Sequence, residues 1–343
     1  MMNKPSITTI IPTFNRAALL KKAVESVLSQ SHKNFQVIIS DNASSDETSA
    51  VLEKLVKTDS RVIVHRQQNN IGGLNNFNFL LGKIDSDYFS ILSDDDYLLP
   101  GFFENALHGF ARHPEAFFGS LKVFDNNPTG IPVMDHFSKS FPEGFFPPPQ
   151  GLIKMTEIGV PTWTGTLFRK EIFEKIGSID PEIPIIDFDF LLRAALKVPF
   201  FVSKANGAVF TSHSLIDLKG SRGSPSAYWP VGKKIIGKLT SENILSVEEK
   251  KKIEENISGM LLGFVYLTGM SAVFRNDIED IKLAQKYLSE TGRNKLRKKI
   301  SITWNLNNIK PGKLMLGLAR KLNKIYYTYK YRQELDNIFK DGQ

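Results

Sequence analysis

Residues 88–96 read Tyr88-Phe89-Ser90-Ile91-Leu92-Ser93-Asp94-Asp95-Asp96, an apolar run that ends in three adjacent carboxylates. The run has the length and composition of a buried strand. Adjacent aspartates repel one another, so a cation is expected to neutralise them beside a buried strand end. Mg²⁺ takes oxygen ligands and is commonly held by one or two carboxylates together with substrate phosphates. The alternative is an acidic, solvated turn, which is a common feature after a strand.

Strands and helices alternate along the first hundred residues. Apolar runs at 7–12, 35–40, 62–65 and 88–92 predict four strands, and apolar stripes within 19–28, 51–56 and 74–81 predict the helices between them. This order is typical of βαβ units, which form a mainly parallel sheet with right-handed crossovers. Further along, we predict a surface loop over 126–150, a strand at 161–168, helices at 169–176 and 187–197, and a strand at 207–212.

Polar clusters follow all four of the first strands. In open α/β sheets, ligands bind beyond the carboxyl ends of the strands. We therefore expect the clusters to face one crevice, where a cation is favoured over a plain acidic turn. Asp41 could accept a hydrogen bond from a base or ribose, or it could cap the helix that begins near Asp46. The four clusters are residues 13–16, 41–42, 69–73 and 94–96.

Together these motifs resemble glycosyltransferase family 2 over about residues 6–225. The stretches that carry the resemblance are Ile10 to Arg16 (IIPTFNR), Ser40 to Asp46 (SDNASSD), Asn70-x-Gly72, Asp94 to Asp96 with Pro100 four residues on, Gly165 to Asp180, and Asp187 to Arg193 (DFDFLLR). The resemblance implies a GT-A fold, which is an α/β fold with a Rossmann-like, mainly parallel sheet flanked by helices. It also implies a nucleotide-diphosphate sugar donor and transfer with inversion at the anomeric carbon.

The resemblance assigns roles to individual residues. Asp187 would be the general base, since the start of a helix keeps a carboxylate ionised, although capping that helix is the alternative. Asp189, two residues on, is a weaker candidate directed at the acceptor. Mn²⁺ or Mg²⁺ would be held by Asp95, with Asp96 in support and His213 completing the site. The nucleotide-sugar would be bound by Pro12, Thr13, Phe14, Asn15, Arg16, Asp41, Asn70, Gly72 and, near the ribose, Asp94. Arg222 could neutralise the diphosphate from a closing loop.

Two departures from the family pattern limit these inferences. Where the family often has Ala-Arg-Asn after Asn70-x-Gly72, this chain has Asn76-Phe77-Asn78, so the arginine that reaches the nucleotide is missing. The choice among UDP, dTDP and GDP therefore stays open. The acidic residue before Asp187 is replaced by Ile186, which leaves the acceptor geometry open.

Two other functions compete with glycosyl transfer. A sugar nucleotidyltransferase would need a glycine-rich loop after the first strand, and residues 12–16 contain no glycine. A non-catalytic carbohydrate- or membrane-binding protein of the same fold would need neither Asp95 nor Asp187. A dehydrogenase is disfavoured, because no G-x-G-x-x-G follows a predicted strand.

The C-terminal third differs from the rest in charge and pattern. Residues 231–343 hold 22 Lys and Arg against 12 Asp and Glu, and residues 293–332 hold 12 basic residues and no acidic one. We predict two domains, a glycosyltransferase domain at 1–228 and a basic helical region at 229–343. The uncharged stretch 257–274 predicts a buried core helix rather than a membrane span.

The basic, aromatic segment 293–332 fits attachment to an anionic membrane surface, where the acceptor would be a glycan or a lipid-linked glycan. The alternative is a helical cap or oligomerisation module. No nucleic-acid-binding signature accompanies the charge, so nucleic acid is not expected as a partner. There are no cysteines, and the apolar run at 7–12 is too short for a secretory signal. We therefore expect a cytoplasmic protein, peripheral on the inner face of the cell membrane.

Overall fold

The computed structural model describes residues 5–126, 132–134, 136–180, 182–211 and 224–308. The chain divides into two compact units. Unit 1 comprises residues 1–125 and 134–211, and unit 2 comprises residues 126–133 and 212–343. The main division, at 211/212, comes earlier in the chain than the boundary predicted at 228/229.

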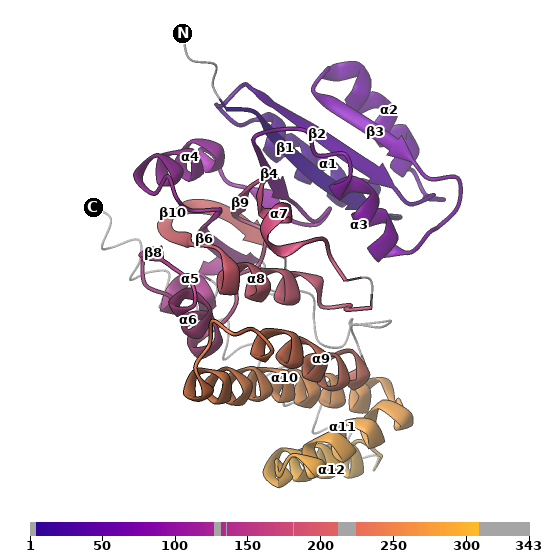
Figure 1. Ribbon diagram of the computed structural model, residues 1–343. Coiled ribbons are helices and arrows are strands. Elements are labelled where there is room, and N and C mark those ends of the chain that lie inside the picture. Colours follow the sequence, from indigo (N-terminus) through magenta and orange to yellow (C-terminus); the bar gives the residue numbers. More distant parts are fainter. Residues whose placement is uncertain (1–4, 127–131, 135, 181, 212–223, 309–343) are drawn as a thin grey trace, which may run out of the picture. The chain divides into compact units, whose positions relative to one another are not determined.

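Unit 1 is built on one sheet with the strand order β3-β2-β1-β4-β9-β6-β10-β5 (Figure 1). Its first half is parallel, because β1 pairs in parallel with both β2 and β4, and β2 pairs in parallel with β3. All four strands and the three helices between them were predicted from the sequence and are confirmed. Their bounds are β1 Ile7–Thr13, α1 Ala17–Leu28, β2 Phe35–Asp41, α2 Thr48–Thr58, β3 Val62–Arg66, α3 Gly73–Leu81 and β4 Tyr88–Ile91.

The second half of the sheet is mixed. Strand β9 lies antiparallel between β4 and β6, while β10 pairs in parallel with β6 and antiparallel with β5 and β8. The predicted α/β class with flanking helices is confirmed, and the parallel part is limited to the four N-terminal strands and the β6–β10 pair. Besides β7, α5 and β8, which are described below, the other elements are β5 Tyr97–Leu98, α4 Phe102–Arg112, β6 Phe118–Asn126, α6 Gln150–Ile158, β9 Thr166–Arg169, α7 Ile172–Ile176, α8 Ile186–Lys197 and β10 Phe200–Phe210.

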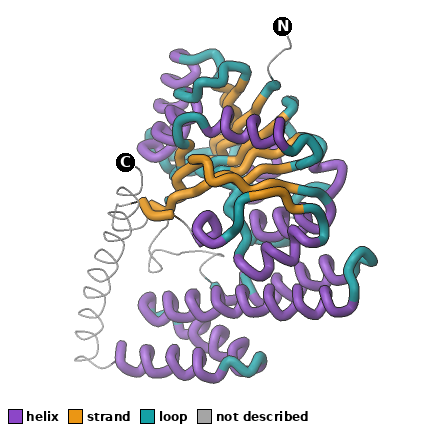
Figure 2. Tube along the Cα trace, turned by 90° about the vertical axis from the view of Figure 1, so that its left-hand side faces the viewer, coloured by secondary structure: helices purple, strands orange, loops and turns teal. Residues whose placement is uncertain are grey.

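Helices cover both faces of this sheet, as Figure 2 shows. The side chains of α1 that recur every three to four residues are fully buried, as the amphipathic pattern predicts, and they are Leu20, Ala23, Val24 and Val27. Strand β1 is almost wholly buried, which is expected of a central parallel strand covered on both faces. Further along the sheet, stacked phenylalanine rings fill the core, for example Phe118 on Phe200 and Phe89 on Phe168.

The prediction of one surface loop over 126–150 is wrong for the described part of that segment. It contains β7 (Pro132–Met134), the short helix α5 (His136–Ser140) and β8 (Gly144–Phe146). Strand β8 extends the sheet beside β10, and Phe141, between α5 and β8, is buried against Phe137, Phe146 and Phe200. The phenylalanines that gave the segment its unusual composition therefore anchor it to the core.

Residues 224–308, the C-terminal described part of unit 2, are helical, as predicted. A short 3-10 turn, η2 (Pro225–Ala227), leads into α9 (Trp229–Thr240), α10 (Val247–Arg275), α11 (Ile278–Glu290) and α12 (Asn294–Asn308). Helix α10 begins with a capping box, in which Ser246 and Glu249 satisfy each other's backbone N–H groups. Glycines allow close helix packing, since a Cβ on Gly232 would lie 2.0 Å from Leu261.

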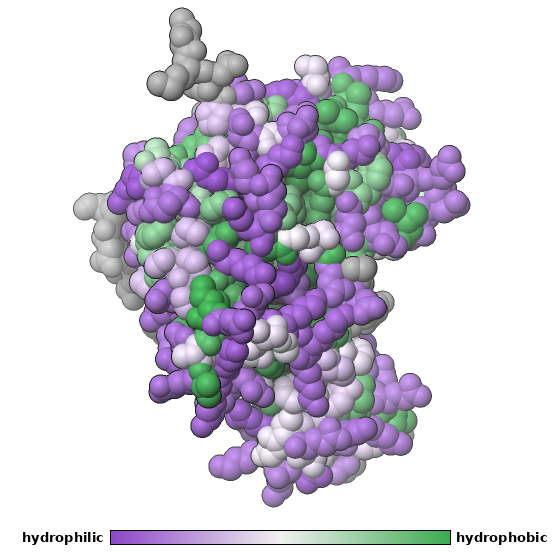
Figure 3. Space-filling model, in the orientation of Figure 1, coloured by the Kyte–Doolittle hydropathy of each residue, from purple (hydrophilic) through white to green (hydrophobic). Residues whose placement is uncertain are grey.

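Helix α10 is, among the described residues, the one helix long and apolar enough to cross a membrane. Half of the qualifying apolar window is buried within the protein. Ile257, Leu261 and Val265 are fully covered, which agrees with the predicted core helix. Hydrophilic residues cover most of the face drawn in Figure 3. Of the basic segment 293–332, residues 309–332 lie outside the described residues.

The packing of Phe201 between two glycines gives a test of the core. A Cβ on Gly119 would lie 2.0 Å from the buried Phe201 ring, whereas a Cβ on Gly73 would meet nothing within 4 Å. We expect Gly119→Ala to lower the free energy of unfolding by about 1–3 kcal/mol, because the ring must move. The control Gly73→Ala should leave it unchanged or raise it by about 0.4–1 kcal/mol. Urea denaturation followed by circular dichroism measures both, and equal effects would contradict the packing.

Candidate active site

The parallel strands bring their carboxyl ends to one edge of the sheet. Thr13, Asp41 and Arg66 are the last residues of β1, β2 and β3, and the pairing register places them side by side across the three strands. Strand β4 pairs with β1 over Ile7–Ile10, so its continuation toward Asp94 runs alongside the end of β1. The predicted convergence of the four clusters is therefore seen at this edge.

Asp94 and Asp95 are joined to the end of β1 by hydrogen bonds and ion pairs. The Thr13 hydroxyl donates to Asp94 Oδ2 at 2.7 Å. The Arg16 guanidinium contacts both carboxylates, at 3.5 Å from Asp94 Oδ1 and in a close ion pair with Asp95 Oδ2. Both aspartate side chains are largely buried, while Arg16 is partly exposed. The Arg16 guanidinium thus bridges the carboxylates of Asp94 and Asp95.

Asp96 is turned into the protein. Its Oδ1 accepts the backbone N–H of Thr211 at 2.8 Å, and its Oδ2 accepts the Thr164 hydroxyl at 2.5 Å. The residue is 1% exposed. Because both oxygens are occupied by the protein, Asp96 ties the ends of β4, β9 and β10 together in this structure, and Asp95 is left as the principal metal-ligand candidate.

Burial sets the protonation of the triplet. It raises the pKa of Asp94 to about 6, against the lowering effect of the Thr13 hydrogen bond and the Arg16 charge. Burial likewise raises the pKa of Asp96 to about 7, despite the hydrogen bond from Thr164. Burial alone would lower the pKa of Arg16, but the charges of Asp94 and Asp95 raise it above its ordinary value. The site therefore holds buried carboxylates whose negative charge the Arg16 guanidinium partly offsets.

Asp41 presents one oxygen that has no hydrogen-bond partner among the described residues. Its Oδ1 accepts the backbone N–H of Ser44 at 3.0 Å, whereas its Oδ2 makes no hydrogen bond and lies 3.6 Å from Arg66 Nε. Asp41 is fully buried, and Arg66 is half exposed beside it. Asp41 does not cap α2, since Asp46 receives the Thr48 N–H there. An unsatisfied buried acceptor is costly, which is typical of a ligand site.

Side-chain amides hold the loops around Asp41. Asn42 Oδ1 accepts the backbone N–H of Ile71 at 2.9 Å, and Asn70 Oδ1 accepts from both Asn42 Nδ2 and the Gly72 N–H. Gly72 has φ +83°, a conformation that favours glycine. Asn15, with φ +54°, accepts the Ser45 N–H through its Oδ1. The side-chain oxygens of Asn15 and Asn70 are thus bonded within the protein, where they hold the loops in shape.

Asp187 and Asp189 lie in the first turn of α8 and differ in their surroundings. Asp187 is half-buried, and its Oδ1 accepts the backbone N–H of Phe188 at 2.9 Å. Asp189 is buried and pairs with Arg193 at 2.8 Å, and Arg193 also binds the Ile176 and Ser178 carbonyls. Through Arg193, Asp189 Oδ2 helps fasten α8 to the end of α7, while its buried Oδ1 has no hydrogen-bond partner among the described residues. Of the two, Asp187 is the accessible carboxylate.

Two predicted site residues, His213 and Arg222, lie outside the described residues. In the described part of the chain, no group of three or more His, Asp or Glu side chains is arranged to hold a metal ion. The oxygen donors that this part offers beside Arg16 are the carboxylates of Asp94 and Asp95.

Sequence reasoning missed Arg66, Thr164 and Thr211. Arg66 could have been found, because a charged residue directly after the apolar run 62–65 marks a strand end. Thr164 and Thr211 carry no such signal, since their partner Asp96 is 68 and 115 residues away in the chain. Phe77, which stands in the place of the family's arginine, is buried and stacks on Trp163, so it offers no positive charge to a nucleotide.

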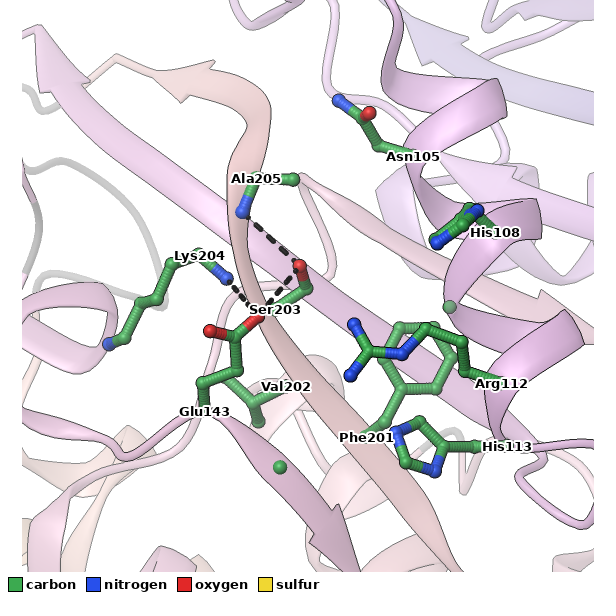
Figure 4. A pocket seen from close by; sticks show the side chains of 12 residues that line it. Asn105, His108, Arg112, His113, Glu143, Phe201, Val202, Ser203, Lys204 and Ala205 are labelled. Carbon is green, nitrogen blue, oxygen red and sulfur yellow. Dashed lines mark hydrogen bonds between the residues drawn. The ribbon is translucent and has the colours of Figure 1, made fainter.

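A separate cavity of about 380 Å³ lies elsewhere on unit 1. Figure 4 shows Asn105, His108 and Arg112 on α4 at one side, with Glu143 and Ser203 at the other. It opens beside the first half of β10, whereas Thr211, just past the end of that strand, is the residue that binds Asp96. The cavity is therefore not part of the carboxylate site.

The family model described as Glycosyl transferase family 2 matches residues 8–177, which include all four strand ends. Residues 8–177 of the chain belong to this family. Two residues of the candidate active site, Asp187 and Thr211, lie after the matched region. The family resemblance drawn from the motifs is thereby confirmed.

Known glycosyltransferases match parts of the chain. It is 41% identical over 98 residues to the GalNAc(5)-diNAcBac-PP-undecaprenol beta-1,3-glucosyltransferase of Campylobacter jejuni, a match that covers 28% of this chain and 32% of that enzyme. The chain thus spans about a third of the length of this relative. Among solved structures, the S. aureus TarS 1–349 complex with UDP-GlcNAc has a TM-score of 0.58 at 16% identity, covering 84% of this chain and 92% of TarS 1–349.

A second solved structure is the mannosyltransferase PcManGT of Pyrobaculum calidifontis in complex with GDP-Man and Mn²⁺. Its TM-score is 0.55 at 14% identity, with 96% of this chain and 88% of that chain covered. At these identities both structures support the GT-A type of fold alone.

The buried Asp96 gives a pH test of the site. Its pKa of about 7 lies above the ordinary 3.8, so the native state holds this proton more firmly than the unfolded state. This group therefore lowers the free energy of unfolding as pH rises from 3.8 to about 7. Asp96→Asn can still accept the Thr211 N–H through its amide oxygen, and its Nδ2 can donate to the Thr164 hydroxyl in place of the bond that Asp96 accepts. The amide has no proton to lose, so the stability of this variant relative to the wild type should increase across that window. Urea denaturation in metal-free buffer measures this, and parallel pH profiles would contradict it.

Proposed function

We propose that this family 2 protein transfers a sugar from a nucleoside-diphosphate donor to a hydroxyl of a glycan or lipid-linked acceptor, with inversion at the anomeric carbon. The observation that carries the proposal is the edge where β1 to β4 end. There a buried Asp41 oxygen has no hydrogen-bond donor among the described residues, and Asp94 and Asp95 flank a guanidinium. A base or ribose can supply the donor, and a diphosphate can use the cationic group.

The donor would lie along this edge. Asp41 Oδ2 would accept an N–H of the base, with the half-exposed Arg66 beside it as a second polar contact. Phe14 is 42% exposed, so its ring is free to pack on the nucleotide. Asp94, held by Thr13, would lie near the ribose, and Arg16 would reach the diphosphate. The comparisons support a nucleotide-sugar as the donor class, since TarS 1–349 binds UDP-GlcNAc and PcManGT binds GDP-Man.

The residues present fit a divalent cation only in part. Asp95 and Asp94 supply hard carboxylate oxygens at a largely buried position that already attracts a cation, namely Arg16. When bound, Mn²⁺ or Mg²⁺ would stabilise the negative charge that develops on the diphosphate leaving group. The proposed ligands are Asp95 first, with Asp94 beside it. His213 remains a proposed ligand outside the described residues.

Asp187 is proposed as the general base. The acceptor hydroxyl attacks the anomeric carbon from the face opposite the diphosphate, its oxygen forms the new bond, and the carbon–oxygen bond to the diphosphate breaks. The hydroxyl proton passes to the carboxylate of Asp187, which stands in the first turn of α8. A single displacement of this kind inverts the anomeric configuration.

The acceptor is proposed to be a component of a cell-surface glycan. The name of the Campylobacter relative describes transfer of glucose to a glycan on polyprenyl diphosphate, which supports a lipid-linked acceptor for this chain. Such acceptors lie at the membrane, so we place the protein in the cytoplasm at the inner face of the cell membrane.

Measurements of the transfer rate and of donor affinity can distinguish the proposed roles of Asp95 and Asp187. Asp187→Asn should lower the rate of sugar transfer by about 10²–10⁴-fold while nucleotide-sugar affinity stays near the wild-type value, because only the proton acceptor is lost. Asp95→Asn should weaken donor binding in the presence of Mn²⁺ and lower donor hydrolysis as well. Release of nucleoside diphosphate from UDP-, dTDP- and GDP-sugars measures the rates of transfer and hydrolysis. A thermal-shift panel with the same sugars measures donor binding and identifies the nucleobase that the site accepts.

The control is Asp85→Asn, which removes an exposed aspartate that pairs with Lys170 at the opposite end of β4. It should transfer sugar at the wild-type rate. Wild-type rates in Asp187→Asn would contradict the base assignment. Donor binding without hydrolysis or transfer in the wild type would favour the non-catalytic binder, and release of pyrophosphate from a nucleoside triphosphate would favour a nucleotidyltransferase.

Membrane attachment through the basic segment is part of the proposal. Helix α12 buries Ile300 and exposes Lys295, Arg297, Lys298 and Lys299, so its charges face outward from unit 2. Each such charge near an anionic bilayer contributes about 1 kcal/mol. We expect flotation with phosphatidylglycerol vesicles at low salt, weakened on the order of tenfold in Lys298→Gln/Lys299→Gln. Lys250→Gln/Lys251→Gln is the matched control, and equal losses in both pairs, or no flotation at all, would contradict the proposal.

A further inference from the structure

We propose that Arg16 is the internal counter-ion of the carboxylate site, so that a divalent cation enters only together with the donor diphosphate. This inference rests on the proposed function and concerns how the same site is loaded. In it, the guanidinium occupies the position between Asp94 and Asp95 until a diphosphate draws it away.

The position of Arg16 follows from the β1–α1 connection. Arg16 is the residue directly before α1, and its carbonyl accepts the first backbone bonds of that helix, from Leu19 and Leu20. The preceding residue, Asn15, is held with φ +54° by its hydrogen bonds to Ser44 and Ser45. The backbone is thereby fixed, and the long side chain reaches from it to the triplet. Its guanidinium contacts Asp94 and Asp95 together.

Electrostatics makes this guanidinium a competitor of the metal. It contacts Asp94 Oδ1 and Asp95 Oδ2, which are among the oxygens that a divalent cation would use. The second oxygen of Asp94 already accepts the Thr13 hydroxyl. A cation that approached the metal-free protein would therefore have to displace a positive charge from a largely buried pair, where charge repulsion is weakly screened.

The protein's own ligand set is also small. Asp96, the third member of the triplet, has both oxygens bonded to Thr164 and Thr211. Within the described ranges, no three acidic or histidine side chains are arranged as a metal site. Ions of this class commonly complete their coordination with substrate phosphates. A diphosphate would supply those oxygens and would also offer the guanidinium a bidentate anionic partner in exchange for the two carboxylates.

Mn²⁺ binding in the absence of substrate tests the proposal. We expect the wild-type protein to bind Mn²⁺ alone weakly, and Arg16→Met to bind Mn²⁺ alone on the order of tenfold more tightly, because one positive charge has left the pair. Addition of UDP or GDP should tighten Mn²⁺ binding strongly in the wild type and much less in Arg16→Met. Electron paramagnetic resonance of free Mn²⁺ measures all of these affinities without any turnover.

The matched control is Lys21→Met, which removes one positive charge from α1 at an exposed position where Lys21 pairs with Glu25 at 3.7 Å. Its Mn²⁺ affinity should equal that of the wild type. Arg16→Lys, which keeps the charge, should stay close to the wild type and guards against a folding defect in Arg16→Met. Equal Mn²⁺ affinity of the substrate-free wild type and Arg16→Met would overturn the proposal while leaving the transferase function standing. Absence of Mn²⁺ binding in every variant with either nucleotide would overturn both the proposal and the metal dependence.

Discussion

Parallel pairing of β1 with both β2 and β4 is the constraint on which the site depends. It brings the ends of strands that are far apart in the chain to one edge and sets Thr13, Asp41 and Arg66 in register. From this edge, Thr13 and Arg16 reach the carboxylates that follow β4. If any of these strands ran in the opposite direction, the polar residues at its carboxyl end would lie at the opposite edge of the sheet.

The cost of the arrangement is buried negative charge, and the surrounding residues offset it in different ways. Asp96 is satisfied by Thr164 and Thr211 and serves to join three strand ends. Asp94 and Asp95 share the Arg16 charge. Asp41 keeps one buried oxygen that has no hydrogen-bond partner among the described residues. Partial satisfaction of this kind is expected where a ligand completes a site.

Much of this could be predicted from the sequence, because the apolar periodicity and the polar residues at the strand ends are local patterns. The four parallel strands, the helices between them and the convergence of residues 13–16, 41–42 and 94–96 all follow from such patterns. The inward turn of Asp96 could not be predicted, since its partners come from distant segments. The helix and strand within 126–150 could not be predicted either, because they depend on β10, which lies far along the chain. Strand β8 pairs with β10, and Phe141 packs on Phe200 of β10.

Hydrogen–deuterium exchange on adding a nucleoside-diphosphate sugar tests the central claim, that the four strand ends form one donor site. The account predicts slower exchange together in the peptides that contain residues 13–16, 41–46, 70–73 and 93–96, with no change around His108 and Arg112. Protection of only one of these peptides, or protection confined to the cavity beside α4, would contradict it.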